Sequence, residues 1–176
     1  MNGAKWAAGY IGYCGNAGLI KGYDAKTFGP SDKVTGYQAL AMILRAVGYG
    51  KNGEFEGADW ELHVAQIAQQ LKVLKNVKGV SLKAAASRAL VAELLFQVAA
   101  YVDTVEYTPA FGYVANTVVT AKAETLGEKN FNLTKSADGA DNWGRPQYKW
   151  FSDDNGNKTV DTKETKYATI QAKPEA

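Results

Sequence analysis

The sequence predicts an α+β protein in which tandem, mostly α-helical helix–loop–helix units are followed by a small β-rich segment. Apolar residues recur at spacings of three and four through residues 4–100, as in helices packed on one face. Two of these helical stretches have counterparts 52 to 54 residues later. Short runs rich in β-branched and aromatic residues follow Tyr101, as in strands. The predicted units are a first repeat at 1–50, a second repeat at 51–101 and a β-rich segment at 102–176.

The composition allows a packed core and disfavours several kinds of partner. Hydrophobic residues make up 46% of the 176 residues, which is enough for a core. The net charge of +2, without a lysine-rich run, does not favour nucleic acid. No apolar run reaches about eighteen residues, so membrane insertion is not expected. The lone cysteine, Cys14, excludes an internal disulfide and is expected to be a buried, unreactive thiol.

The first helix is predicted at residues 4–16. Gly9 and Gly12 weaken it by about 1 kcal/mol each relative to alanine, so we expect them to let another backbone approach closely. A loop with Phe28 as a buried aromatic anchor follows. The expected apolar face of the helix consists of Trp6, Tyr10, Tyr13, Cys14 and Ala17.

The central helix is predicted at residues 35–48, and both of its ends are marked. Thr35 is an N-cap, and Gln38 stands three residues later, which is the spacing of a capping box. Gly48 suits a left-handed turn at the C-terminal end. The expected apolar face consists of Ala39, Met42, Ile43, Ala46 and Val47.

A second helix–loop–helix unit repeats this order, with helices expected at 60–71 and 87–99. Similar residues fall at matched places in the two units, which predicts an internal repeat. Glycine and asparagine, the types that best tolerate a left-handed backbone, are matched where the loops begin. The aligned pairs are Trp6 with Trp60, Leu19 with Val73, Gly22 with Asn76 and, after a loop shorter by two residues, Thr35 with Ser87.

These residues resemble the S-layer homology repeat over about residues 4–100. The resemblance implies tandem two-helix repeats, often three, packed about a pseudo-threefold axis. It also implies non-covalent anchoring of a bacterial surface protein to secondary cell-wall polysaccharide, often one with pyruvylated sugars. The stretches that carry the resemblance are Trp6-Ala7 with Ile11, Ala17-Gly-Leu-Ile-Lys-Gly22, Phe28-Gly-Pro30 and Val34-Thr35.

The chain departs from the family where the second helix of each repeat begins. The family has Thr-Arg-Ala-Glu there, and its arginine lies in the groove that receives the acidic sugar. The first unit has Thr35-Gly36-Tyr37-Gln38 and the second has Ser87-Arg88-Ala89-Leu90, so only the second keeps the arginine. Two repeats are recognisable, and a third would come from before Met1, from after Tyr101 or from another chain.

Arg88 is the leading candidate for a glycan-binding cation. Its planar guanidinium can hold a carboxylate through two parallel hydrogen bonds, and it stands in the first turn of a helix. A solvated surface residue, or one paired with Glu93, is the alternative. The other candidates are the helix-start residues Ser87, Thr35 and Gln38, the matched lysines Lys21 and Lys75, and Trp6 and Trp60, which serve either as core anchors or as platforms for sugars.

The segment at 102–176 predicts short strands and turns. Asp154-Asn155-Gly156-Asn157 is typical of a hairpin turn between strands at 148–151 and 158–160. The remaining elements expected are strands at 102–107, 113–120 and 167–172, a helical turn at 124–130 and a compact turn at 142–146.

Residues 153–164 partly match a calcium-binding loop. Its sixth position, where the loop demands glycine, is Lys158, so a plain hairpin is favoured and no metal or other cofactor is predicted. The acidic and polar residues at ligand positions are Asp153, Asn155, Asn157, Thr159, Asp161 and Glu164.

Catalysis is not predicted, because the single histidine, His63, has no nucleophile or orienting partner by sequence. We therefore expect a non-catalytic module that anchors a cell-surface protein by binding secondary cell-wall polysaccharide. The alternative is a structural S-layer protein whose repeats bind other S-layer subunits without glycan. Residues 1–6 lack signal-peptide features, so the chain is either cytoplasmic or a fragment of a larger exported protein. The internal repeat favours the fragment, and with it an extracellular location at the cell wall.

Overall fold

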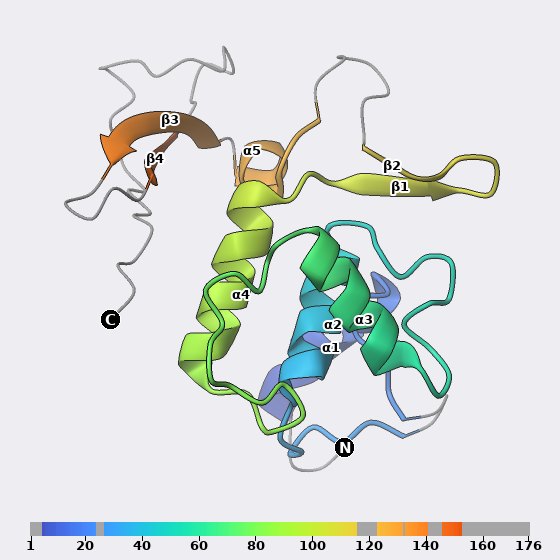
Figure 1. The fold of residues 1–176 in the computed structure, drawn as a ribbon. Helices are drawn as coiled ribbons and strands as arrows, with labels where there is room; N and C mark the ends of the chain where they lie inside the picture. The colour runs from blue at the N-terminus through green and yellow to red at the C-terminus, as the bar shows by residue number, and fades with distance from the viewer. Residues whose placement is uncertain (1–4, 24–26, 116–122, 132, 141–145, 153–176) are drawn as a thin grey trace.

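The computed structural model describes residues 5–23, 27–115, 123–131, 133–140 and 146–152. Helices and two-stranded antiparallel sheets occur together, which confirms the α+β class (Figure 1). The helical elements are η1 (Lys5–Ala7), α1 (Ala8–Asn16), α2 (Gly36–Ala46), α3 (Trp60–Gln70), α4 (Arg88–Tyr101) and α5 (Leu126–Phe131). The strands are β1 (Val105–Thr108), β2 (Gly112–Ala115), β3 (Leu133–Ala140) and β4 (Pro146–Ser152).

Helix α2 has both of the predicted end structures. The Thr35 hydroxyl accepts a hydrogen bond from the Gln38 amide at 3.2 Å, and the Gln38 side chain accepts one from the Thr35 amide at 2.9 Å. At the other end, Gly48 has φ +107°. The amides of Gly48 and Tyr49 donate to the carbonyls of Arg45 and Leu44, which is the Schellman pattern. The capping box and the left-handed glycine are therefore confirmed.

The buried face of α2 is wider than predicted. Ala39, Ile43 and Val47 are buried as expected, but Ala46 is exposed and Met42 is only partly buried. Helix α2 packs against both α3 and α4, so it needs two adjoining apolar stripes instead of one. The second stripe is formed by Leu40, Ala41 and Leu44.

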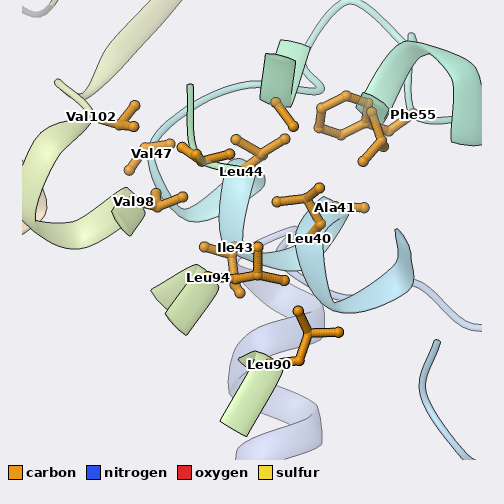
Figure 2. Close-up of a cluster of buried hydrophobic side chains, with 13 residues drawn as sticks. Leu40, Ala41, Ile43, Leu44, Val47, Phe55, Leu90, Leu94, Val98 and Val102 are labelled. Atoms are coloured by element: carbon orange, nitrogen blue, oxygen red, sulfur yellow. The ribbon is translucent and has the colours of Figure 1, made fainter. Parts of the chain in front are cut away.

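The core lies where α2, α3 and α4 meet, and Figure 2 shows its side chains converging from these helices and from the loop after α2. Leu40, Leu44 and Leu94 are each 0% exposed. Burying a leucine side chain contributes about 1.5–3 kcal/mol, so each of these residues adds substantially to the stability of the helical part. Loop residues complete the core, namely Phe55, Val73 and Val102.

Helix α1 does not pack as predicted. The exposed fractions of Trp6, Tyr10 and Tyr13 are 82%, 73% and 73%, and Cys14 is only partly buried. A methyl group placed on Gly9 would meet nothing within 4 Å in the described structure, so this glycine admits no close backbone there. Helical spacing predicted an apolar face for this helix, but it could not show whether another element packs against that face.

Helices α1 and α3 end in the same way, 54 residues apart. Gly18 has φ +69° and Lys72 has φ +58°, whereas the predicted left-handed pair, Gly22 and Asn76, lacks positive φ. The left-handed residue was predicted four positions too late. It lies directly after each helix, where a backbone amide just beyond the helix donates to a carbonyl in the last turn. The matching hydrogen bonds run from Leu19 to Cys14 at 2.9 Å and from Val73 to Ala68 at 3.1 Å.

Strands β1 and β2 form an antiparallel hairpin in which Val105 pairs with Ala115. This hairpin begins later than the predicted strand at 102–107, because Val102 is buried in the helical core. The Val105 amide donates to the Val47 carbonyl at 2.8 Å, which fixes the hairpin to the end of α2. The predicted helical turn at 124–130 is present as α5.

Strand β4 covers the predicted strand at 148–151, but it pairs with β3, which the sequence did not predict. Residues 133–140 read Leu-Thr-Lys-Ser-Ala-Asp-Gly-Ala and lack the β-branched, alternating pattern of a half-buried strand. The predicted elements at 158–160 and 167–172 and the calcium-like loop at 153–164 lie outside the described residues, as does most of the turn at 142–146.

Candidate functional site

A cleft of about 480 Å³ lies beside α2. Its walls come from the loop after α1, from residues 55–57 and from the start of α3. This volume is within the usual range of small-molecule sites, and the lining combines aromatic rings with charged groups. The rings belong to Tyr23, Phe28, Phe55 and Trp60, and the charged groups are Lys21, Asp32, Lys33, Arg45 and Glu56.

Arg45 reaches the cleft from α2 and is half-buried. Its Nη2 donates to the Phe55 carbonyl at 3.2 Å, and its guanidinium lies 5.7 Å from the centre of the Phe55 ring. Burial lowers the pKa of Arg45, and the carboxylates of Glu56 and Glu54 oppose that shift. Arginine remains charged in proteins and carries five N–H donors, so a cation with further donor capacity lines the cleft.

An ion pair joins two walls of the cleft. The Lys21 ammonium, from the loop after α1, donates to the Glu56 carboxylate, from the loop before α3. The hydrogen bond and the charge of Lys21 lower the pKa of Glu56. Both side chains are about half exposed, at 52% and 53%, so solvent screens the pair and an anionic ligand can compete for Lys21.

A second polar contact braces the outer wall. The Tyr23 hydroxyl donates to the Asp32 carboxylate at 2.8 Å. That hydrogen bond, and then the negative charge of Asp32, raises the pKa of Tyr23. The brace connects the two sides of the loop that lies between α1 and α2.

Three of the predicted glycan-binding residues, Lys21, Gln38 and Trp60, line this cleft. Thr35 adjoins it through the capping box that it shares with Gln38. Trp60 is partly buried and packs against the core, as a core anchor should. The structure therefore brings four of the eight candidates together.

The other four candidates lie elsewhere. Ser87 caps α4, because its hydroxyl accepts from the Leu90 amide at 3.1 Å, and Arg88 beside it is exposed. Glu93 accepts from Asn76 at 2.9 Å and from Gln97 at 2.8 Å, and within the described chain it forms no ion pair with Arg88.

Lys75 and Trp6 are also outside the cleft. The Lys75 ammonium lies 4.8 Å from the centre of the Tyr101 ring, where a cation–π interaction holds it. Trp6 is 82% exposed, so its interpretation as a core anchor is wrong. Its ring remains accessible to a partner.

Sequence reasoning missed Arg45, Glu56 and Asp32. Arg45 stands seven residues after Gln38, which places both side chains on one face of α2, so helical spacing would have found it. Glu56 and Asp32 lie in loops without a repeating pattern. Only the tertiary fold brings them to the cleft.

In the part of the chain that the structure describes, no group of three histidine, cysteine or acidic side chains is placed to hold a metal ion. Among the same residues, no helix is both long and apolar enough to cross a membrane.

Comparison with known families identifies one part of the chain. Residues 2–40 match the S-layer homology domain. The predicted resemblance is confirmed over this interval, which lies in the first unit. The matched interval contains α1, the loop with Lys21 and Asp32, and the first turn of α2 with Gln38, so the residues similar to that domain form one side of the cleft.

Two bacterial relatives are similar to the chain. The middle cell wall protein of Brevibacillus brevis is 29% identical over 77 residues, which is 44% of this chain and 7% of the relative. The surface layer protein of Brevibacillus choshinensis is 35% identical over 49 residues, which is 28% of this chain and 4% of the relative. The chain thus spans less than a tenth of these relatives. No solved structure matches it.

Proposed function

We propose that this chain is a non-catalytic, extracellular cell-surface module that binds secondary cell-wall polysaccharide. The observation that carries the proposal is the position of the cleft. One of its walls is built by the residues that match the S-layer homology domain, and Arg45, Glu56 and Trp60, which lie outside that match, line the same space. Relatives named as a cell wall protein and a surface layer protein support the location.

The chemistry of the cleft suits an acidic sugar. Aromatic rings such as those of Trp60 and Tyr23 can stack on the apolar face of a pyranose. Arg45 and Lys21 can pair with a carboxylate on the glycan. Arg88, at the start of α4, is a separate proposed contact, because it retains the arginine that the first unit lacks.

The proposed module contains two S-layer-homology-like repeats, at 1–50 and 51–101. The matching helix ends at Gly18 and Lys72 support the repeat, as do the matching side-chain caps at Thr35 and Ser87. Both features fix the backbone at the ends of helices, so they support a shared fold even where the other side chains differ.

Co-sedimentation with purified cell-wall sacculi tests the proposal. The wild-type chain should pellet with sacculi, and Arg45→Ala and Lys21→Ala should each weaken this, as should Arg88→Ala if the second unit also contacts glycan. Lys83→Ala is the matched control, because Lys83 is a cation whose side chain is 77% accessible and does not line the cleft; its ammonium lies 3.9 Å from the Glu61 carboxylate. Retention of the wild-type chain in the supernatant would end the proposal.

A second candidate function is assembly with other S-layer subunits without glycan. The exposed face of η1 and α1 favours it, because the residues of α3 that correspond to Trp6 and Tyr10 are Trp60 and Val64, and these pack on the core. This function predicts concentration-dependent assembly in the absence of polysaccharide, weakened by Trp6→Ala. Light scattering that reports a monomer at every concentration would exclude it.

A further inference from the structure

We propose that Tyr113, in the β1–β2 hairpin, is a positioning residue for the cleft. It fastens the loop between α2 and α3, and the next residues of that loop form one wall of the cleft. The effect of Tyr113 on ligand binding rests on the proposed glycan function, whereas its effect on the position of the cleft wall does not. Tyr113 lies outside the residues that match the S-layer homology domain.

The contact is a closed hydrogen-bond network, which we call the Tyr113 latch. The Tyr113 hydroxyl donates to the Glu54 carboxylate and accepts from the amides of Lys51 and Asn52 at 3.0 and 3.3 Å. The same carboxylate accepts from the amides of Gly50 and Asn52 at 3.0 and 3.1 Å. One hydroxyl and one carboxylate thus hold three consecutive amides, at Gly50, Lys51 and Asn52.

Neighbouring rings hold the hydroxyl in place. The Tyr113 ring lies 4.9 Å from the Tyr49 ring and 5.2 Å from the Tyr107 ring, measured between centres. Burial, followed by the hydrogen bond to Glu54, raises the pKa of Tyr113 to about 12. The phenol therefore keeps its proton at neutral pH and remains a donor to the carboxylate.

The hairpin meets the α2–α3 loop at a second point. A methyl group placed on Gly48 would lie 1.9 Å from the Val105 carbonyl oxygen, so the two backbones touch directly. The Val105 amide also donates to the Val47 carbonyl at 2.8 Å. Figure 1 shows the hairpin running above this loop. Attachment at both Val105 and Tyr113 makes the hairpin a brace along the loop.

The latch connects directly to the cleft. Glu54 is followed by Phe55, which is 4% exposed and whose carbonyl holds Arg45, and then by Glu56, which pairs with Lys21. The loop contains Gly50, Gly53 and Gly57 with φ near +80°, so its own backbone resists movement weakly. The Tyr113 latch restrains this flexible loop. Because Phe55 and Glu56 follow Glu54 directly, the latch also positions the groups that bind Arg45 and Lys21.

The binding module therefore continues beyond the predicted boundary at 101–102 and includes the hairpin to Ala115. A hydroxyl at residue 113 acts on cations that belong to α2 and to the loop after α1. The glycan site, on this account, depends on a segment that contributes no side chain to its lining.

The test compares Tyr113→Phe with Tyr107→Phe in the full chain. Each variant removes one hydroxyl from the same hairpin and keeps the ring, but only Tyr113 holds the α2–α3 loop. Native-state hydrogen exchange should accelerate roughly tenfold at the amides of residues 50–52 and at Glu56 in Tyr113→Phe, as expected for one lost hydrogen bond to a charged group. Sacculus binding should fall about three- to tenfold in the same variant, and Tyr107→Phe should match the wild type in both measurements.

Unchanged exchange at residues 50–56 would overturn the proposal, and so would equal acceleration throughout α4, which indicates global destabilisation only. Faster exchange with undiminished sacculus binding would remove the positioning role. If the wild-type chain does not bind sacculi, the proposed glycan function is wrong. Hydrogen exchange at the Glu56 amide, which donates to the Gly53 carbonyl, still decides whether the Tyr113 latch fixes the position of the cleft wall.

Discussion

Gly48 is where the end of α2 and the start of the β1–β2 hairpin touch, and we predict a large loss of stability for Gly48→Ala. Its φ of +107° costs an alanine about 1–2 kcal/mol. The added methyl would also lie 1.9 Å from the Val105 carbonyl oxygen, so the strand must move. That movement breaks the hydrogen bond between Val105 and Val47, which contributes about 1 kcal/mol, and opens packing around it. The expected loss is about 3 kcal/mol.

Gly53→Ala is the matched control for Gly48→Ala. Gly53 has φ +82°, but a methyl there meets no atom of the described structure within 4 Å. It should therefore cost only the backbone term of about 1–2 kcal/mol. Urea unfolding followed by circular dichroism measures both losses, and for a chain of this size Tm should fall by about 2–4 °C per kcal/mol. Equal losses in the two variants would refute the close-contact argument.

Three further predictions concern stability. The pKa of Tyr113 is raised from 10 to about 12, so the stability contributed by its protonated hydroxyl is complete below pH 10 and is lost as the pH rises toward 12. The Tm difference between the wild type and Tyr113→Phe should therefore shrink between pH 10 and pH 12. Thr35→Ala and Ser87→Ala should each cost about 1 kcal/mol in urea unfolding, and a cap that costs nothing would contradict its assignment. Trp60→Ala should cost about 3 kcal/mol and Trp6→Ala less than about 0.5 kcal/mol by the same measurement, and a similar cost for both would show that α1 is packed in solution.

The sequence predicted what local chemistry determines. The ends of α2 were predictable because Thr35, Gln38 and Gly48 act on backbone groups a few residues away. The existence of α1 was predictable from the helical spacing of its apolar residues. Their exposure was not, because burial depends on whether another element packs against that face in the folded protein. Strand β3 was missed since its polar sequence gains strand structure only by pairing with β4.

Some residues of the candidate site could likewise be predicted from local sequence patterns, and others could not. Lys21, Gln38 and Trp60 were found because each stands at a repeated or capped position. Arg45 carried a usable signal in its helical spacing from Gln38. Glu56 carried none, because its partner, Lys21, is 35 residues away in the chain and meets it only in the folded state. Residues that act through tertiary contact, such as Tyr113, are beyond the reach of spacing arguments.

Lys72 offers a way to stabilise the protein without altering the core or the cleft lining. Among the described non-glycine residues, it is the one with positive φ, and glycine stands at the corresponding place after α1. A left-handed lysine costs about 1–2 kcal/mol that glycine would not. Lys72 is exposed and lies outside both the core and the cleft lining, so Lys72→Gly is a natural first substitution for making a more heat-resistant version of this chain.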